Sequence, residues 1–289
     1  MKINKRVIIN LFLLAIMVMG SFSAAYAVRV KSDEDAKIAG KLIDVAVAAG
    51  DSYGARIVAV AKALEGTPYA EPADNDSIGT VVANLHGFDK LGFINNVLAI
   101  VKASRKVSPT FNDYQNALVE VSRRKGVDIG FPSQLIYVSD WIVDNTYRGN
   151  IEEKTEYSTG GGFKTKTLDY VSRHKEEFPA LKDSTVLDKV KLMEMGYRSH
   201  RIPHLKKQSI NNKTTHELLA DGDIIVLLAN DMDFDLYDIG FVEMKNGMPY
   251  LIHLSRETGK VVEDEYPLPR LFKIENQHFY GYRWLRPKE

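Results

Sequence analysis

Residues 88–104, FDKLGFINNVLAIVKAS, carry a strong helical pattern. Phe93, Val97, Leu98 and Val101 recur at helical spacing, so they share one face. We expect a helix from about residue 89 to residue 104 whose apolar face packs against the core of the protein.

The last third of the sequence changes to a strand pattern. Residues 223–228, 237–244, 249–254 and 278–285 are rich in residue types that favour strands. The tripeptide Lys245-Asn246-Gly247 lies between two of these segments and indicates a hairpin. Helices followed by a meandering sheet predict an α+β fold, in which N-terminal helices and a central helix pack on a C-terminal antiparallel sheet.

The rest of the chain has weaker patterns. Residues 33–64 read as helical with an interruption at Gly54, and Gly66-Thr67-Pro68-Tyr69 ends that run. Further predicted elements are a strand at 81–85, a helix at 112–124, a strand or buried turn at 135–138, a loop at 158–162 and a helix at 181–201. No repeat or linker divides the chain, so we expect a single domain over residues 28–289.

The composition excludes several functional classes. The chain has 289 residues, of which 45% are hydrophobic and 26% charged, values typical of a globular protein. Its 38 basic residues balance its 38 acidic ones, unlike the basic surface of a nucleic-acid-binding protein. The sequence contains no cysteine, which excludes disulfides, thiolate metal sites, lipoprotein anchoring through cysteine and cysteine nucleophiles.

The N-terminus has the pattern of a secretory signal peptide. Lys2, Lys5 and Arg6 precede an apolar run at residues 7–19, and Ala25-Tyr26-Ala27 forms an A-x-A cleavage site. The alternative is a membrane anchor, but this run is shorter than the about 20 residues that span a bilayer. We expect cleavage after Ala27, export to a bacterial periplasm, and no stable membrane anchor afterwards.

Several short motifs occur in a recognisable order. They are GTPY at 66–69, VANL at 82–85, FDKLGFINNVLA at 88–99, YVSDWI at 137–142 with Asn145, GDII at 222–225, DLYDIGF at 235–241 and LIHLS at 251–255. Together they resemble the bacterial N-acetylmuramoyl-L-alanine amidase-like proteins, a family of the NlpC-type, papain-like cysteine peptidase superfamily. The resemblance covers roughly residues 64–271.

The resemblance implies a catalytic cysteine at the start of the central helix, a histidine base on the facing sheet and a second histidine that orients the base. A cysteine in a first helical turn meets unpaired N–H groups that favour its thiolate. In this sequence Lys90 occupies the nucleophile position and Asp238 the base position, and only the third position is kept, as His253. The cysteine-peptidase mechanism is therefore absent.

Lys90 and Asp238 have complementary charges at the two substituted positions. A lysine at a helix N-terminus is unfavourable unless an anion compensates it. We predict a Lys90–Asp238 ion pair that fills the former catalytic cleft. Two alternatives stay open: the two side chains do not meet, or they support new catalysis, for which a nearby carboxylate is unhelpful because it favours the ammonium form.

Other residues are candidates for ligand contacts. Asp140, Trp141 and Asn145 could contact a glycan or peptide, although Trp141 also suits packing beneath the cleft. Tyr69 follows a turn and could reach the site. His253 could orient a ligand group or form part of the wall.

No metal site or cofactor is expected. His200 and His204 are four residues apart, but Pro203 would break the helix that such a metal site needs. His174, His216 and His278 show no grouping typical of metal ligands, and we expect them on the surface.

Three functions follow from this reading. The first is a catalytically inactive relative of cell-wall amidases that binds a peptidoglycan fragment or an envelope protein. The second is an active amide hydrolase with a substituted, non-cysteine site. The third is a structural envelope protein with a closed cleft. Fold alone does not distinguish them, because chemistry resides in the site.

Overall fold

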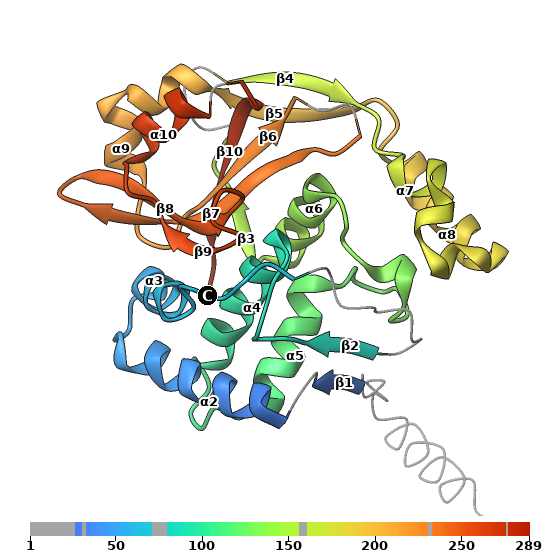
Figure 1. Cartoon of the computed structure of the whole chain (residues 1–289), viewed down its shortest axis with the longest axis horizontal. Coiled ribbons are helices and arrows are strands. Elements are labelled where there is room, and N and C mark those ends of the chain that lie inside the picture. Colours follow the sequence, from blue (N-terminus) through green and yellow to red (C-terminus); the bar gives the residue numbers. More distant parts are fainter. Residues whose placement is uncertain (1–26, 31–32, 71–79, 156–160, 231–232, 276) are drawn as a thin grey trace, which may run out of the picture.

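A computed structural model describes residues 27–30, 33–70, 80–155, 161–230, 233–275 and 277–289 (Figure 1). The predicted signal peptide, except Ala27, lies outside these residues, as do residues 158–160 of the predicted loop. The described chain combines helices with an eight-stranded sheet whose strands pair antiparallel. This confirms the predicted α+β class.

The N-terminal part is helical. Its helices are α2 (Asp33–Ala48), α3 (Tyr53–Ala63), α4 (Lys90–Ala103), α5 (Phe111–Ser122) and α6 (Val138–Arg148). The predicted helical run at 33–64 breaks near Gly50, whose φ is 92°, and not at Gly54, which lies inside α3. Ser52 begins α3 by accepting a hydrogen bond from the Ala55 N–H. A short parallel pair joins β1 (Ala27–Val30) to β2 (Thr80–Ala83).

The C-terminal part supplies most of the large sheet. The strand order is β4 (Gly161–Lys166), β5 (His200–Lys206), β10 (Phe279–Pro287), β6 (Ile224–Ala229), β7 (Leu236–Lys245), β8 (Met248–Ser255) and β9 (Lys260–Glu263), with β3 (Ile151–Glu153) also pairing with β10. The four predicted strands correspond to β6, β7, β8 and β10. Asn246 and Gly247 both have positive φ, so the predicted hairpin joins β7 to β8 through the expected turn chemistry.

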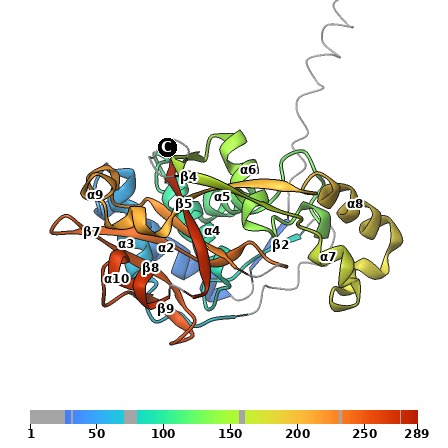
Figure 2. The ribbon, with the colours of Figure 1, turned by 90° about the horizontal axis from the view of Figure 1, so that it is seen from above.

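The sheet is covered on both faces, as Figures 1 and 2 show. On β6, Ile224, Val226 and Leu228 belong to the core shared with the N-terminal helices. Ile225 and Leu227 belong to a second core with α10 (Leu268–Ile274), which lies with α9 (Lys213–Leu218) on the other side. The central helix α4 is buried nearly all round, beyond the one apolar face expected from its sequence.

Some predicted elements differ from the structure. Residues 135–138 form the buried turn and not the strand, and α6 begins at Val138. The helix predicted at 181–201 is shorter, because α8 covers Ser184–Met195 and β5 begins at His200. Gly161 and Gly162 lie in β4, where they pair with β5, and not in a loop.

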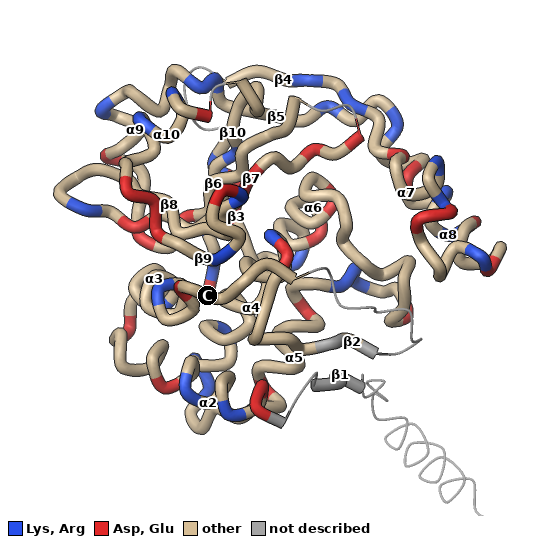
Figure 3. The backbone as a smooth tube through the Cα atoms, in the orientation of Figure 1, with Lys and Arg blue, Asp and Glu red and all other residues tan. Residues whose placement is uncertain are grey.

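Charged residues are spread over the fold, as Figure 3 shows. Helix α8, near the short helix α7 (Tyr170–Arg173), carries both acidic and basic residues. The paired strands β4 and β5 carry lysine and arginine but no acidic residue.

Asp235 anchors the start of α6 from a distant part of the chain. Its two carboxylate oxygens accept hydrogen bonds from the backbone N–H groups of Val138 and Ser139, at 3.1 and 2.6 Å. Replacing Asp235 with alanine leaves two buried donors without their acceptor. We expect Asp235→Ala to lower the free energy of unfolding by about 2 kcal/mol, measured by urea denaturation. A loss similar to that of the exposed Asp188→Ala would contradict this role.

Candidate functional site

The start of α4 faces the sheet where β7 and β8 lie side by side. Lys90 is the first residue of α4, and the Asp89 side chain caps the helix by accepting from the Gly92 N–H. Asp238 lies on β7 and His253 on β8, where His253 pairs with Gly240. The fold thus brings together three residues that are far apart in the sequence.

Lys90 and Asp238 form the predicted ion pair. Lys90 Nζ lies 2.9 Å from Asp238 Oδ1 and also donates a hydrogen bond to the carbonyl oxygen of Tyr237. The Lys90 side chain keeps 19% of its surface exposed and the Asp238 side chain 8%. The structure therefore confirms the ion pair, and the open alternative without contact is wrong.

The pair continues into a row of alternating charges. His253 Nδ1 lies 2.8 Å from Asp238 Oδ2, and its Nε2 lies 3.4 Å from Asp264 Oδ1. The row Lys90–Asp238–His253–Asp264 ends at a residue that sequence reasoning missed. Asp264 follows β9, whose pairing with β8 carries it to His253, and no motif marks it.

These contacts shift the pKa values of the two central groups. Burial alone would lower the pKa of His253, but the carboxylates of Asp238 and Asp264 outweigh burial and raise it to about 10. Burial alone would raise the pKa of Asp238, but His253 and Lys90 lower it to about 2. The row therefore holds a doubly protonated imidazolium beside an ionised carboxylate at neutral pH.

This protonation occupies both ring nitrogens of His253. An imidazolium with both ring nitrogens protonated has no lone pair and cannot accept a proton as a general base. Lys90 Nζ is engaged by Asp238 Oδ1 at 2.9 Å and by the carbonyl oxygen of Tyr237. The arrangement suits ion pairing.

The row predicts a fall in stability at alkaline pH. Folded His253 holds its proton up to about pH 10, whereas the unfolded side chain releases it near the ordinary histidine pKa of 6.5. Its contribution is therefore complete below pH 6.5 and disappears as the pH rises through about 10. We expect the free energy of unfolding, from urea titrations between pH 6 and 10, to fall more steeply for the wild type than for His253→Gln. Equal slopes would contradict the prediction.

The sequence profile of one protein family matches residues 59–276. Its description is N-acetylmuramoyl-L-alanine amidase-like. The chain belongs to this family. The match confirms the resemblance drawn from the motifs, and it spans Lys90, Asp238 and His253. The wider NlpC-type superfamily and the family roles of these three positions stay predictions.

Solved structures share the fold of this chain. The amidase-like protein is similar to an N-acetylmuramoyl-L-alanine amidase from Bacteroides uniformis, with 23% identity, a TM-score of 0.72, and coverage of 82% of this chain and 99% of the other. A Bacteroides fragilis protein whose name suggests a xylanase has 25% identity, a TM-score of 0.68, and coverage of 78% and 98%. A Legionella pneumophila protein has 15% identity and a TM-score of 0.67, and the match covers 89% of this chain and 94% of the other. No protein of curated function matches significantly.

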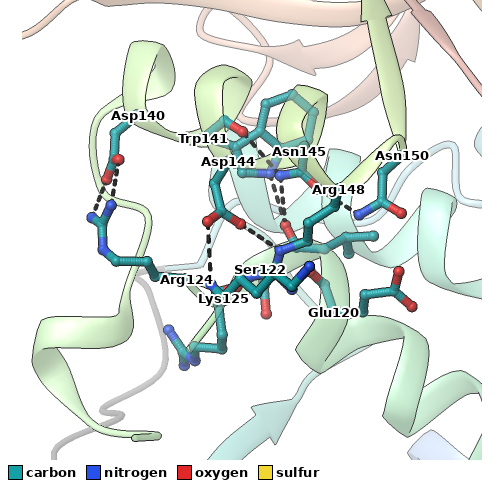
Figure 4. Close-up of polar contacts among 12 residues, drawn as sticks. Glu120, Ser122, Arg124, Lys125, Asp140, Trp141, Asp144, Asn145, Arg148 and Asn150 are labelled. Atoms are coloured by element: carbon teal, nitrogen blue, oxygen red, sulfur yellow. Dashed lines mark hydrogen bonds and ion pairs between the residues drawn. The ribbon is translucent and has the colours of Figure 1, made fainter. Parts of the chain in front are cut away.

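Asp140, Trp141 and Asn145 are fully buried in the amidase-like protein. Figure 4 shows their polar contacts. Arg124 forms a bidentate ion pair with Asp140, which also accepts from the Tyr197 hydroxyl. Sequence reasoning missed both partners. Asp140 is therefore an internal ion-pair partner in this structure.

Trp141 and Asn145 hold the end of α5 against α6 (Figure 4). Trp141 Nε1 donates to Asn95 Oδ1 and to the carbonyl oxygen of Val121, and Asn145 Nδ2 donates to the same carbonyl. Carbonyls at a helix C-terminus lack helical partners, so these side chains supply them. Of the two alternatives for Trp141, the structure therefore shows internal packing.

Tyr69 and five histidines complete the candidate residues. Tyr69 is 49% exposed and its backbone pairs with Phe88, two residues before Lys90. His200 and His204 lie on β5 and not on a helix. His278 is exposed, whereas His174 and His216 are half-buried, so the surface prediction is correct for His278 alone.

The described residues offer no group of three His, Asp or Glu side chains that could hold a metal ion. Within the same residues, no helix is long and apolar enough to cross a bilayer.

Proposed function

We propose that this amidase-like protein is catalytically inactive and binds a peptidoglycan fragment. The observation that supports it most is the row Lys90–Asp238–His253–Asp264, in which both ring nitrogens of His253 face carboxylates. The sequence also contains no cysteine that could replace the missing nucleophile. A site with neither base nor nucleophile can still bind, because binding and chemistry use different groups.

We also propose that the mature protein is a single domain that begins at Val28 and acts in the periplasm. Cleavage after Ala27 would leave Val28, Arg29 and Val30 to pair with β2. The cut would therefore fall at the edge of the first strand and cost one pair of the register. N-terminal sequencing of the exported protein tests this position.

The function is tested by separate measurements of turnover and binding. Residues 28–289 are incubated with peptidoglycan and with muropeptides, beside an active amidase as positive control, and the products are analysed by mass spectrometry. We expect no amide cleavage, together with muropeptide binding in isothermal titration calorimetry.

Two results would contradict the proposal. Cleaved products that disappear in Lys90→Ala or His253→Ala would support an active hydrolase with a substituted site. Absence of both cleavage and muropeptide binding would favour an envelope protein as the partner, or a purely structural role. An affinity search for envelope partners would then separate these two.

A further inference from the structure

A hollow of about 370 Å³ lies next to the row of charges. Its lining comes from the end of β6, the start of β7 and residues between them, from Arg256 after β8, and from residues between α10 and β10. The lining side chains include those of Asn230, Phe234, Tyr237, Arg256, Gln277 and His278. Tyr237 joins the hollow to the row, because its carbonyl oxygen accepts the Lys90 hydrogen bond.

The hollow has a fixed aromatic part. The rings of Tyr237 and His278 are nearly parallel, at 8°, with centroids 5.4 Å apart. The Tyr237 hydroxyl donates to Glu275, which holds the ring in place. Phe234 adds a ring that is 36% exposed and lies 4.5 Å from that of Tyr170. Rigid aromatic groups of this kind provide contact area at little cost in conformational entropy.

The hollow also has a positive group without an ionic partner. The Arg256 guanidinium lies 5.6 Å from the centre of the Tyr237 ring, within cation–π range. Arg256 is exposed and forms no ion pair with any residue that the structure describes. A guanidinium presents a planar fork of donors that matches a carboxylate.

Two amide side chains complete the lining. Asn230 donates from Nδ2 to the carbonyl oxygen of Gln277, and from its backbone N–H to that of His278, so the two walls are tied together. Gln277 adds a second amide that can bond hydroxyl groups. A pocket with aromatic walls and a few placed polar groups is typical of a small-molecule site, and about 370 Å³ is near the lower end of such sites.

We infer that this hollow binds an acidic sugar, with the ring against Tyr237 and His278 and the carboxylate on Arg256. The inference deepens the proposed function and rests on it for the origin of the ligand. The shared chemistry is a pyranose that carries a free carboxylate. It could be N-acetylmuramic acid released from peptidoglycan, whose lactyl carboxyl is free only once its amide bond to the peptide has been cut, or a uronic acid of another polysaccharide.

Binding of single sugars to residues 28–289 tests the inference. The probes are N-acetylmuramic acid, D-glucuronic acid and the neutral N-acetylglucosamine, each titrated at millimolar concentration and followed by protein NMR. We expect at least one acid to bind at least about tenfold more tightly than the neutral sugar, since a hydrogen-bonded charge pair is worth about 1.5 kcal/mol or more. Binding of glucuronic acid alone would indicate a source other than peptidoglycan.

Variants locate the site. Arg256→Gln should weaken binding of the acid about tenfold, and His278→Ala should weaken it several-fold. Arg270→Gln is the matched control, because Arg270 is also exposed and lies 3.5 Å from a tyrosine ring centre, that of Tyr266, but outside the hollow. It should bind like the wild type.

The inference fails if neither acid binds, if the neutral sugar binds equally well, or if Arg256→Gln retains full affinity. Muropeptide binding without acid-sugar binding would overturn this inference and leave the proposed function standing. Binding of an acidic sugar without binding of muropeptides would contradict the proposed function and leave this inference standing.

Discussion

Asp238→Asn should lower the free energy of unfolding by about 3 kcal/mol, a large share of the about 5–15 kcal/mol of a typical domain. The substitution keeps the shape of the side chain and removes its charge. Asp238 is buried and pairs with Lys90 and His253 at 2.9 and 2.8 Å, so both cations lose their shared carboxylate. Urea denaturation at pH 7 measures the loss.

Two further variants separate the ion pair from a general effect of substitution. Asp188 is exposed on α8, so Asp188→Asn should change the free energy of unfolding by less than about 0.5 kcal/mol. Lys90→Met removes one of the stranded cations, so Asp238→Asn with Lys90→Met should be more stable than Asp238→Asn alone. Simple addition of the two losses would show that Lys90 and Asp238 are not coupled.

The coupling of Lys90 with Asp238 could be predicted because both residues stand inside motifs whose order indicates their place in a fold. The sequence pattern located the central helix and the four main strands, whose periodicity follows from burial of a face. Asp264 could not be found in this way. It reaches His253 only through the register of β8 with β9, which a turn at Gly259 sets.

The strands β4 and β5 show a second limit. They contain Gly161, Gly162 and Pro203, which local rules assign to loops and turns. Their pairing with each other, and that of β5 with β10, overrides these local preferences. Such pairing between distant segments leaves no trace in a short window of sequence.

Polar residues of the motifs did not predict ligand contacts reliably. Asp140 and Asn145 looked available for a ligand because their partners, Arg124 and the end of α5, lie elsewhere in the sequence. A buried polar residue and a ligand-binding one have the same composition, and only the hydrogen-bond partners distinguish them. Tyr237 and Arg256 carried no signal because the hollow they line is built from three segments that are separate in the sequence.

Trp141→Ala should lower the free energy of unfolding by about 4 kcal/mol and thereby separate the two interpretations of this residue. The side chain is fully buried, and its Nε1–H donates hydrogen bonds to Asn95 Oδ1 and to the carbonyl oxygen of Val121, at 2.8 and 3.0 Å. Trp141→Phe keeps most of the apolar volume and loses only the donor, so about 1–2 kcal/mol is expected. Urea denaturation measures both.

The control for this series lies on the same helix. Tyr147 is 77% exposed on α6, so Tyr147→Ala should cost less than about 0.5 kcal/mol. If Trp141 only packs, Trp141→Phe should bind muropeptides like the wild type, because its lost hydrogen bonds lie inside the helical layer. A Trp141→Phe protein with full stability and lost muropeptide affinity would mean that α6 opens to admit the ligand, and Trp141 would then return as a binding residue.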